Sequence, residues 1–571
     1  MKKTIRVILA VVLVLTMLCS VAACAPAGTS SAAGTASTGA SSAAGTASGT
    51  TSTGASSEEA KDPYAEWPTA DDKVTLQYWV SLSGNAQAGL SSYNDHSMYK
   101  EMEKITGIKM EFNHPADAAV DFNLMIVSDP DERPDLVEHG WAGIDGGPQK
   151  YIDDGVILQL DELLEKYAPD ALNAMTQTEI ITKLSKTDGG HFYVFNCPIS
   201  TTWDAPNANI KDKVQAGAIV RADWLKDLGL DKPENFEDWE EMLTKFKDEK
   251  GASAPLCFQP TDSTALTVLT GMFDTYRDYY ARNGKVVFGP YEENYKAFLQ
   301  AMNKWFEAGL IDPDLAANDG AAVKAKVLNS DAGVLFGYTS TFTTYIDTSS
   351  GKEEGFDLTA VTYPDRLNGE KPLFMVRSAD VRTSGYCAIM ANCEYPEWAA
   401  KYMNHFYTED GMLLKNFGVK DVAWEFGDDG SVLKTELLTK NPDGLSAQQA
   451  LGVYSRGDVP APGYLLKTLD LVTKTLGNER VLEAYDTWLP EADNCDEIYL
   501  PTLSQTPEEA LELSQYNTNI NTYVNECRLK FIVGTMDIDT EWDAYIAQLK
   551  TLGIETVLEL KQTAYERYLK R

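Results

Sequence analysis

The cysteine at position 24 has the surroundings that point most directly to a chemical modification. It follows Val21, Ala22 and Ala23, which come after a basic start and an apolar stretch over 7–18. This order is typical of a secretory signal peptide, and the stretch is too short to anchor stably across a bilayer. Small residues directly before a cysteine indicate a bacterial lipoprotein signal, in which the Cys24 thiol receives diacylglycerol. The alternative is an ordinary signal peptide with an unmodified cysteine.

The segment 25–57 consists almost entirely of Ala, Gly, Ser and Thr, and one eight-residue sequence occurs at 30–37 and again at 41–48. Such a composition has nothing to bury, so we expect the segment to stay disordered. Its r.m.s. reach of about 30 Å would hold a folded body away from a membrane. The N-terminal sequence therefore predicts a protein on the extracellular face of the cell membrane, lipid-anchored in the manner of Gram-positive lipoproteins.

The formal net charge of −36 restricts the partners of the body. A surface this acidic argues against nucleic acid and against adsorption on anionic lipid. No second long apolar run follows residue 18, so the sequence predicts no transmembrane helix. A body of about 510 residues exceeds the usual size of one hydrophobic core, so we expect two or more lobes.

The body has too few cysteines for a disulfide scaffold. No Cys-x-x-Cys spacing occurs and the chain has 5 histidines, so we predict no zinc site and no cofactor. Cys387 and Cys393 lie six positions apart around an apolar strand, where their side chains could share a face. We favour buried free thiols, with a disulfide between these two as the alternative. The six cysteines are Cys197, Cys257, Cys387, Cys393, Cys495 and Cys527.

Strand and helix patterns alternate along the body, which is typical of an α/β sheet with helices on its faces. Apolar runs predict strands at 74–80, 108–112, 134–138, 191–197, 218–221, 332–336 and 384–391. Helical spacing of apolar residues predicts helices over 93–106, 223–228, 236–248, 295–306, 396–406, 540–549 and 557–568. Asp539 or Thr540 is the expected cap of the second-last helix. The last third is helix-rich.

Several segments, in this order and spacing, resemble one family. They are 218–230 with its Arg-Ala-Asp-Trp-Leu, 304–313 with Glu-Ala-Gly-Leu-Ile-Asp, 409–418 followed by 422–425, 523–534, 541–543 and 564–568. They resemble the extracellular solute-binding proteins of carbohydrate ABC transporters, of the lipoprotein type common in Gram-positive bacteria. Together they extend from about residue 74 to the end.

The resemblance implies a fold, a function and partners. The fold is α/β, a two-lobe periplasmic-binding-protein-like fold with a ligand cleft between the lobes and a helix-rich C-terminal region. The function is non-catalytic: capture of a carbohydrate, such as an oligosaccharide, and delivery to an ABC importer permease by a membrane-tethered monomer. The implied organisation begins with a signal peptide at 1–23 and a lipidated linker at 24–65. The first part of lobe 1 follows at 66–200 and the first part of lobe 2 at 201–384. The chain returns to lobe 1 at 385–571, where C-terminal helices pack on both lobes.

Within this fold the candidates for ligand contact lie where strands end or the chain crosses between lobes. Aromatic rings stack on the C–H faces of sugars, and carboxylates, amides and arginine bind their hydroxyls. For each candidate the alternative is a packing or rim position, and for Arg221 it is a salt bridge between lobes. Tryptophans within helix patterns are expected in the core. The candidates are Trp141, Trp203, Asp204, Arg221, Tyr338 and Trp424.

Some relatives, including alginate-oligosaccharide binders, hold calcium in a loop equivalent to 247–255. Here that loop lacks alternating oxygen ligands, so we carry over no calcium site, and Asp428–Gly430 is expected to form a hairpin turn. Three alternatives remain: a binding protein for a non-sugar solute such as a peptide, a sensor subunit, and a surface glycoside hydrolase. The last needs two facing carboxylates. No G-x-S-x-G, H-E-x-x-H or P-loop sequence is present.

Overall fold

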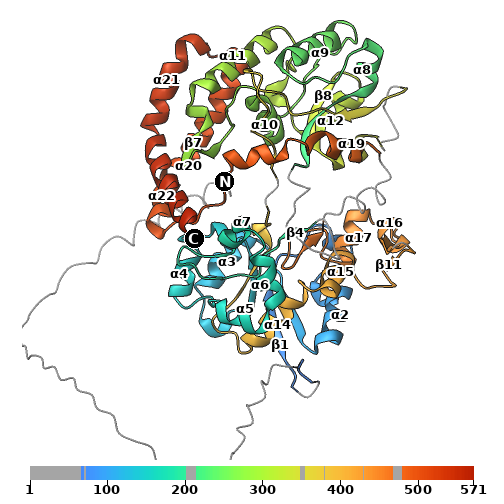
Figure 1. Cartoon of the computed structure of the whole chain (residues 1–571), viewed down its shortest axis with the longest axis vertical. Coiled ribbons are helices and arrows are strands. Elements are labelled where there is room, and N and C mark those ends of the chain that lie inside the picture. The colour runs from blue at the N-terminus through green and yellow to red at the C-terminus, as the bar shows by residue number, and fades with distance from the viewer. Residues whose placement is uncertain are drawn as a thin grey trace, which may run out of the picture. The chain divides into compact units, whose positions relative to one another are not determined.

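The computed structural model describes residues 66–69, 72–200, 214–346, 354–377, 380–428, 430–466 and 479–571, and Figure 1 shows them with many of their helices and strands labelled. The predictions made for Cys24, for the signal peptide and for the linker concern residues outside this description. So do those made for Trp203 and Asp204.

A four-stranded sheet forms the centre of the first lobe, in the order β10-β3-β1-β2. β1 runs parallel to β2 and β3, whereas β10 is antiparallel to β3. β10 is buried on both faces and has a continuous apolar sequence, whereas the outer strand β2 alternates buried Met110 and Phe112 with exposed Lys109 and Asn113. The strands are β1 (Thr75–Trp79), β2 (Lys109–Asn113), β3 (Leu136–His139) and β10 (Tyr386–Ile389).

The strand predicted at 191–197 is wrong. This segment forms isolated bridges with two partners, from Phe192 to Lys186 and from Phe195 to Cys387. Since neighbouring residues pair with different segments, no ladder forms, although the side chains are as buried as in a strand. The apolar sequence of 191–197 therefore reflects burial of its side chains and not pairing of its backbone in a sheet.

Helices cover the first sheet. α2 ends at Gly107, whose φ of 68° lets its N–H bond to the carbonyl of Glu103. The other helices of this lobe are α3 (Ala118–Ile126), α4 (Gly147–Asp153), α5 (Asp161–Tyr167), α6 (Pro169–Met175), α7 (Glu179–Ser185), α14 (Pro396–His405), α15 (Glu409–Phe417), α16 (Glu436–Thr439) and α17 (Ala447–Tyr454), after α2 (Ser97–Thr106). The predicted turn at 428–430 lies between β11 (Trp424–Phe426) and β12 (Val432–Lys434), which pair as an antiparallel hairpin.

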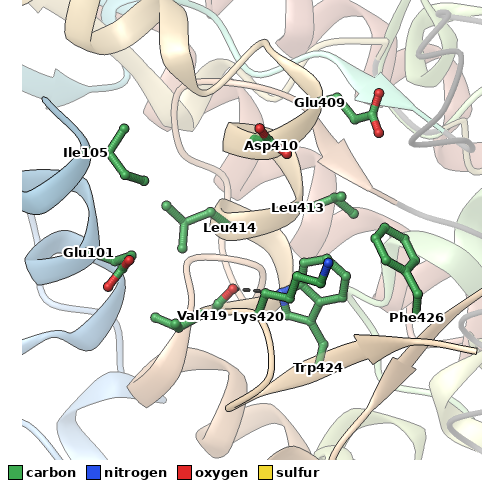
Figure 2. Close-up of a pocket in the computed structure, with 11 residues that line it drawn as sticks. Glu101, Ile105, Glu409, Asp410, Leu413, Leu414, Val419, Lys420, Trp424 and Phe426 are labelled. Carbon is green, nitrogen blue, oxygen red and sulfur yellow. Dashed lines mark hydrogen bonds between the residues drawn. The ribbon is translucent and has the colours of Figure 1, made fainter. Parts of the chain in front are cut away.

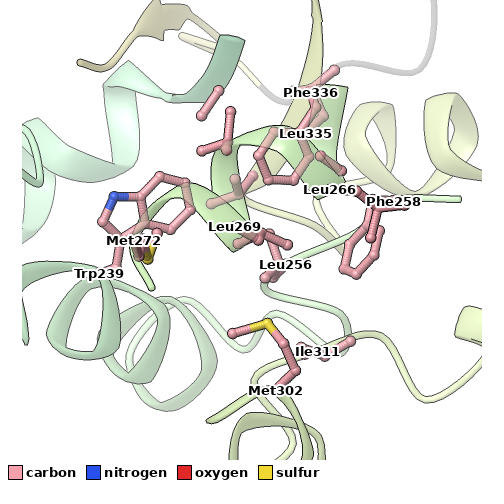
Figure 3. Close-up of a cluster of buried hydrophobic side chains, with 14 of the residues drawn as sticks. Trp239, Leu256, Phe258, Leu266, Leu269, Met272, Met302, Ile311, Leu335 and Phe336 are labelled. Carbon is pink, nitrogen blue, oxygen red and sulfur yellow. The ribbon is translucent and has the colours of Figure 1, made fainter. Parts of the chain in front are cut away.

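The second lobe surrounds a three-stranded sheet in the order β8-β5-β9, in which both outer strands are antiparallel to β5. Figure 3 shows the core beneath it, where side chains of α9 and α10 meet those of β8. The strands are β5 (Ala216–Arg221), β8 (Val334–Tyr338) and β9 (Leu358–Ala360), with a hairpin of β6 (Tyr279–Arg282) and β7 (Lys285–Phe288).

The helices of the second lobe bury the predicted tryptophans. Trp224, Trp239, Trp305 and Trp542 are at most 2% exposed, as is appropriate for core residues. The helices are α8 (Ala222–Leu228), α9 (Phe236–Asp248), α10 (Ser263–Gly271), α11 (Glu293–Glu307), α12 (Gly320–Leu328), α13 (Ser340–Ile346), α19 (Glu479–Trp488), α20 (Pro507–Ile532), α21 (Ile538–Thr551) and α22 (Ile554–Lys570).

The predicted cap of α21 is displaced by two residues. The carboxylate of Asp537 accepts from the backbone N–H groups of Asp539 and Thr540, so Asp537 is the cap and both predicted residues lie in the first turn. All three side chains are cap formers or dipole partners, so spacing alone could not select among them.

The six cysteines of the body are buried free thiols, as predicted, and the alternative disulfide between Cys387 and Cys393 is not formed. No helix within the described ranges is both long enough and apolar enough to cross a membrane.

The chain changes from one lobe to the other between Ser200 and Val214, between Arg377 and Asp380, and between Leu466 and Glu479. The described residues of the first lobe at these positions lie together. β4 (Ile199–Ser200) pairs in parallel with β13 (Leu465–Leu466), and Pro198 bridges Val381. At 378–379, Arg377 pairs with Asp380 at 2.8 Å, with both side chains 7% exposed. The three connections are therefore held against one another where they leave the first lobe.

A buried lysine on α15 holds this junction. Lys415, 1% exposed, donates from Nζ to the carbonyls of Gly463 at 2.7 Å and Tyr464 at 3.0 Å. Its neighbour Asn416 donates to Tyr464 and accepts from the N–H of Leu466. Burial lowers the pKa of Lys415 to about 8, because a buried ammonium is poorly solvated.

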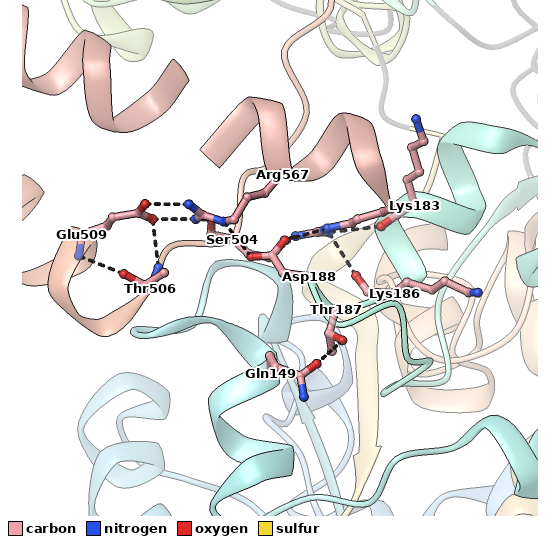
Figure 4. A network of polar contacts seen from close by, with 10 residues as sticks. Gln149, Lys183, Lys186, Thr187, Asp188, Ser504, Thr506, Glu509 and Arg567 are labelled. Atoms are coloured by element: carbon pink, nitrogen blue, oxygen red, sulfur yellow. Dashed lines mark hydrogen bonds and ion pairs between the residues drawn. The ribbon is translucent and has the colours of Figure 1, made fainter. Parts of the chain in front are cut away.

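The C-terminal helix makes a further contact between lobes, shown in Figure 4. Val557 on α22 lies in the core of the second lobe, whereas Tyr568 lies in a core of the first. Arg567 forms a bidentate pair with Glu509 at the start of α20, and Arg571 pairs with Asp188 at 2.7 Å in the loop after α7. The guanidinium groups thus join α20, α22 and the first lobe in one network.

Replacing Lys415 changes how stability depends on pH. Between pH 8 and 10.5 the unfolded chain binds a proton at Lys415 that the folded protein has lost, so the free energy of unfolding rises with pH over this window. The full rise is about 3 kcal/mol, at about 1.4 kcal/mol per pKa unit. We expect Lys415→Met to abolish that rise, measured by urea denaturation at pH 7 and pH 9.5.

Lys440→Met is the control, since its side chain is 78% exposed and should leave the pH dependence unchanged. The groups that interact electrostatically with Lys415 are Glu138, Arg456 and the Cys197 thiol. All three are present in both variants, so they do not account for a difference between them. Equal pH dependence in wild type and Lys415→Met would contradict the assignment.

Candidate functional site

Of the predicted residues that the structure describes, Tyr338 is the one with a ring available to a ligand. It ends β8 and is 52% exposed, next to an open cavity of about 340 Å³. The cavity is lined by Gln259, Thr261, Asp262, Ser263, Thr264, Phe336, Gly337 and Tyr338.

The sheet fixes the position of the ring. Tyr338 pairs with Ala216, the first residue of β5, and the N–H of Thr339 bonds to the carbonyl of Gln215. The chain therefore enters the second lobe, directly after 201–213, beside Tyr338. A Cβ on Gly337 would collide with the hydroxyl of Thr341, so glycine allows the strand to end close to α13. The site lies at the carboxyl end of β8, where open α/β sheets commonly bind ligands.

The core supports the floor of the cavity. Phe336, two residues before Tyr338, is 8% exposed and stacks on Trp239 with a ring separation of 6.4 Å. Figure 3 shows Phe336 beside Leu266 of α10 and Phe258. Since these side chains are packed at core density, the cavity wall is rigid.

The start of α10 supplies the polar wall. Oδ1 of Asp262 accepts from the N–H groups of Thr264 at 2.8 Å and Ala265 at 3.1 Å, which caps the helix. Burial raises the pKa of Asp262, and these bonds partly oppose that rise. Within the described part of the chain no residue bonds to Oδ2, so this oxygen can accept from a ligand.

The cavity thus combines an exposed aromatic ring with hydroxyl, amide and carboxylate groups. Such a set suits a polyhydroxylated ligand that has apolar C–H faces. Its volume is at the low end of the range of about 300–1,000 Å³ for ligand pockets.

Trp141 lies in a different environment. It is 0% exposed, its Nε1 donates to the carbonyl of Val137 at 2.9 Å, and its ring meets the edges of Phe122 and Tyr151. No part of the indole faces solvent, so the structure places this side chain in core packing. Ligand contact by Trp141 has no support in this geometry.

Arg221 is also buried, at 0% exposure. Its guanidinium makes a bidentate pair with Asp223 and lies 4.4 Å from the ring of Trp224. This ion pair lies within the second lobe, whereas the alternative we considered was a salt bridge between lobes. The arrangement orients the start of α8.

Trp424 lines a second cavity, of about 250 Å³, in the first lobe (Figure 2). The indole is 3% exposed and donates from Nε1 to the carbonyl of Gly418 at 2.8 Å. The structure therefore separates the two aromatic candidates: Tyr338 and Trp424 line different cavities in different lobes.

Sequence reasoning missed the polar wall at Gln259 and Asp262. The available signal was Asp262 followed by Ser and Thr at the start of an apolar helix, which predicts a cap. A cap does not by itself indicate a ligand, and its proximity to Tyr338 arises from packing between residues 76 positions apart (338 − 262).

Among the described residues, no cluster of three or more His, Cys, Asp or Glu side chains is arranged to hold a metal ion.

Comparisons with known proteins agree on one family. The profile of the family described as bacterial extracellular solute-binding protein matches residues 96–413. The fructooligosaccharide ABC transporter substrate-binding protein FusA of Streptococcus pneumoniae is 25% identical over 553 residues, covering 90% of this chain and 94% of FusA. Lipoprotein LipO of Bacillus subtilis is 22% identical, covering 81% of this chain and 88% of LipO.

Solved structures show the same fold. A solute-binding protein of Bifidobacterium longum infantis, described as HMO-binding and associated with an ABC transporter, has a TM-score of 0.69 at 18% identity. The alignment covers 87% of this chain and 99% of that protein. The predicted fold class, α/β and periplasmic-binding-protein-like, is confirmed.

The burial of Trp141 predicts a stability effect. Trp141→Ala removes a fully buried indole and leaves a cavity, so we expect the free energy of unfolding to fall by about 3–5 kcal/mol, measured by chemical denaturation. Tyr338→Ala is the control, because truncating an exposed ring should change stability by less than about 0.5 kcal/mol. A loss for Trp141→Ala no larger than for the control would contradict its place in the core.

Proposed function

Because the chain belongs to the bacterial extracellular solute-binding proteins, we propose that it captures a carbohydrate, such as an oligosaccharide, and delivers it to the permease of an ABC importer. The observation that carries this proposal is the Tyr338 cavity, where an exposed ring stands beside hydroxyl, amide and carboxylate groups at a strand end. We infer that Tyr338 stacks on a sugar ring and that Asp262 and Gln259 bind its hydroxyls.

The relatives support a sugar over other solutes. FusA is named for fructooligosaccharides, and the Bifidobacterium protein is described as HMO-binding. Both are described as solute-binding proteins of ABC transporters. A free carboxyl terminus would be expected to meet a cationic side chain, and none of the described residues that line the cavity is cationic.

We propose that the protein binds its ligand without hydrolysing it. Glycoside hydrolases use two carboxylates on either side of the scissile bond. Among the described residues that line the cavity there is one carboxylate, Asp262, and one of its oxygens already caps α10. This supports binding by hydrogen bonds over acid–base catalysis.

We also propose a lipid anchor at Cys24, with the body presented as a monomer at the extracellular face of the membrane. The lipoprotein-type sequence at 21–24 and the resemblance to LipO support this placement. Tethering keeps the body near the membrane partner to which the ligand is delivered.

A thermal-shift screen of purified protein against kestose, nystose, milk oligosaccharides and alginate oligosaccharides tests the carbohydrate proposal, with peptides as controls. A ligand at 100 times its Kd should add about 2.7 kcal/mol of stability. We expect a saturable shift for one glycan class and intact glycan afterwards. A shift for peptides alone, or consumption of the glycan, would refute the proposal.

The same assay tests the assigned ring. We expect Tyr338→Ala to weaken binding about tenfold or more, corresponding to at least about 1.4 kcal/mol, because the stacking surface is lost. Tyr338→Phe keeps the ring and should bind within about threefold of wild type, unless the hydroxyl also bonds to the sugar. Unchanged affinity in Tyr338→Ala would remove Tyr338 from the site.

Lipidation at Cys24 is tested by fractionation. We expect full-length wild type to remain with the membrane after a high-salt wash, because acyl chains and not charge hold it there. Cys24→Ser should release the protein into the soluble fraction. Release of the wild type by salt, or retention of Cys24→Ser, would contradict the anchor.

A further inference from the structure

The cavity beside Trp424 has the features of an interaction surface and not of a sugar site. Figure 2 shows it between α2, one side of α15 from its start at Glu409, and the β11–β12 hairpin, all in the first lobe. None of its lining residues belongs to the Tyr338 cavity. Its volume of about 250 Å³ is below the range of about 300–1,000 Å³ for ligand pockets, and suits one or two side chains.

The floor of this cavity is apolar and rigid. Leu413 and Leu414 on α15 are at most 7% exposed, and Trp424 is 3% exposed and held by its bond to Gly418. These residues belong to the main core of the first lobe. A partner side chain inserted here would meet a preformed apolar wall.

Exposed apolar side chains surround the floor. Ile105 is 41% exposed on α2, and Phe426 is 36% exposed on the opposite wall. These two side chains stand on opposite walls of the cavity. Large apolar side chains that are exposed together mark surfaces that another molecule covers.

The rim carries negative charge. Glu101, Glu409 and Asp410 line the cavity with one lysine, Lys420, which gives three negative charges and one positive, a net of −2. In the described part of the chain neither Glu409 nor Asp410 forms a salt bridge, whereas Glu101 pairs with Lys104. An apolar centre with an acidic rim suits an apolar side chain next to Lys or Arg.

The aromatic rings are poorly placed to stack on sugar. Trp424 is buried, and Phe426 meets its ring edge-on at 5.0 Å while Lys420 Nζ lies 4.9 Å from the Phe426 centroid. The face of Phe426 is therefore partly covered by a cation. A second copy of this chain is also disfavoured as the occupant, because two chains of formal net charge −36 repel each other.

We propose that the Trp424 cavity docks a cationic, apolar-anchored segment of a protein partner, in which Leu or Phe fills the cavity and adjacent Arg or Lys meets Glu409 and Asp410. This rests on the proposed function, which supplies such a partner: the permease that receives the solute. The cavity in the first lobe would then recognise the transporter while the Tyr338 cavity in the second recognises the solute.

The direct test uses fluorophore-labelled acetyl-Arg-Leu-Phe-Arg-amide, titrated with the full-length protein by fluorescence anisotropy. We expect saturable binding, and at least about fivefold weaker binding in Ile105→Ser and in the double variant Glu409→Gln/Asp410→Asn. Acetyl-Glu-Leu-Phe-Glu-amide should not bind. Each altered side chain is exposed at the surface, so the variants should fold.

Matched controls separate docking from general attraction to an acidic surface. Leu511→Ser removes an apolar side chain that is 68% exposed on α20, and Glu436→Gln neutralises a carboxylate whose side chain is 82% exposed on α16. Both should change peptide affinity by less than about twofold. Equal weakening by cavity and control variants, or no binding below about 1 mM, would overturn the proposal.

Two further readouts distinguish the alternatives. The cavity variants should keep the wild-type thermal shift with carbohydrate; if they lose it, the cavity belongs to the sugar site, and docking is refuted while carbohydrate binding stands. Conversely, peptide binding without any carbohydrate shift would refute the proposed function alone. If sedimentation velocity shows self-association that Ile105→Ser abolishes, a second copy is the occupant and the proposal is wrong.

Discussion

The contact on which the architecture depends is the set of hydrogen bonds from Lys415 and Asn416 to the backbone at 463–466. These bonds hold β13 beside β4, so two of the three connections between lobes leave the first lobe as paired strands. A lysine in this position is costly, since burial lowers its pKa to about 8, yet it satisfies two carbonyls at once. The buried lysine therefore fixes the relative position of β4 and β13.

The entry of the chain into the second lobe lies beside the proposed solute site. Residues 201–213 lead directly into β5, whose first residue pairs with Tyr338, so the ring stands at the entry of the chain into the second lobe. The core under β8 and α10 keeps that ring and Asp262 in a fixed relation. In our proposal, recognition of the solute depends on packing within the second lobe, and docking at the acidic Trp424 cavity depends on packing within the first.

The sequence predicts the strands and helices of this fold better than it predicts the residues of the candidate ligand site. Strands at 74–80 and 218–221 and the buried helix tryptophans follow from apolar spacing, because burial itself creates that pattern. The same logic fails at 191–197, which is buried without pairing. Trp141 and Tyr338 both follow strands, yet one is 0% and the other 52% exposed. Which strand end opens to solvent depends on neighbouring elements, such as Phe122 of α3 packed against Trp141. The position of Asp262 beside Tyr338 likewise depends on how α10 packs against β8, which local sequence spacing does not predict.

The most direct test of carbohydrate capture at Tyr338 is a crystal structure of the protein with the glycan that gives the largest thermal shift. We predict a sugar ring stacked on Tyr338, at about the 3.5–4.0 Å carbon–carbon contact distance, with hydroxyls bonded to Asp262 and Gln259. A glycan bound elsewhere, such as in the Trp424 cavity, or one cleaved in the crystal, would contradict it.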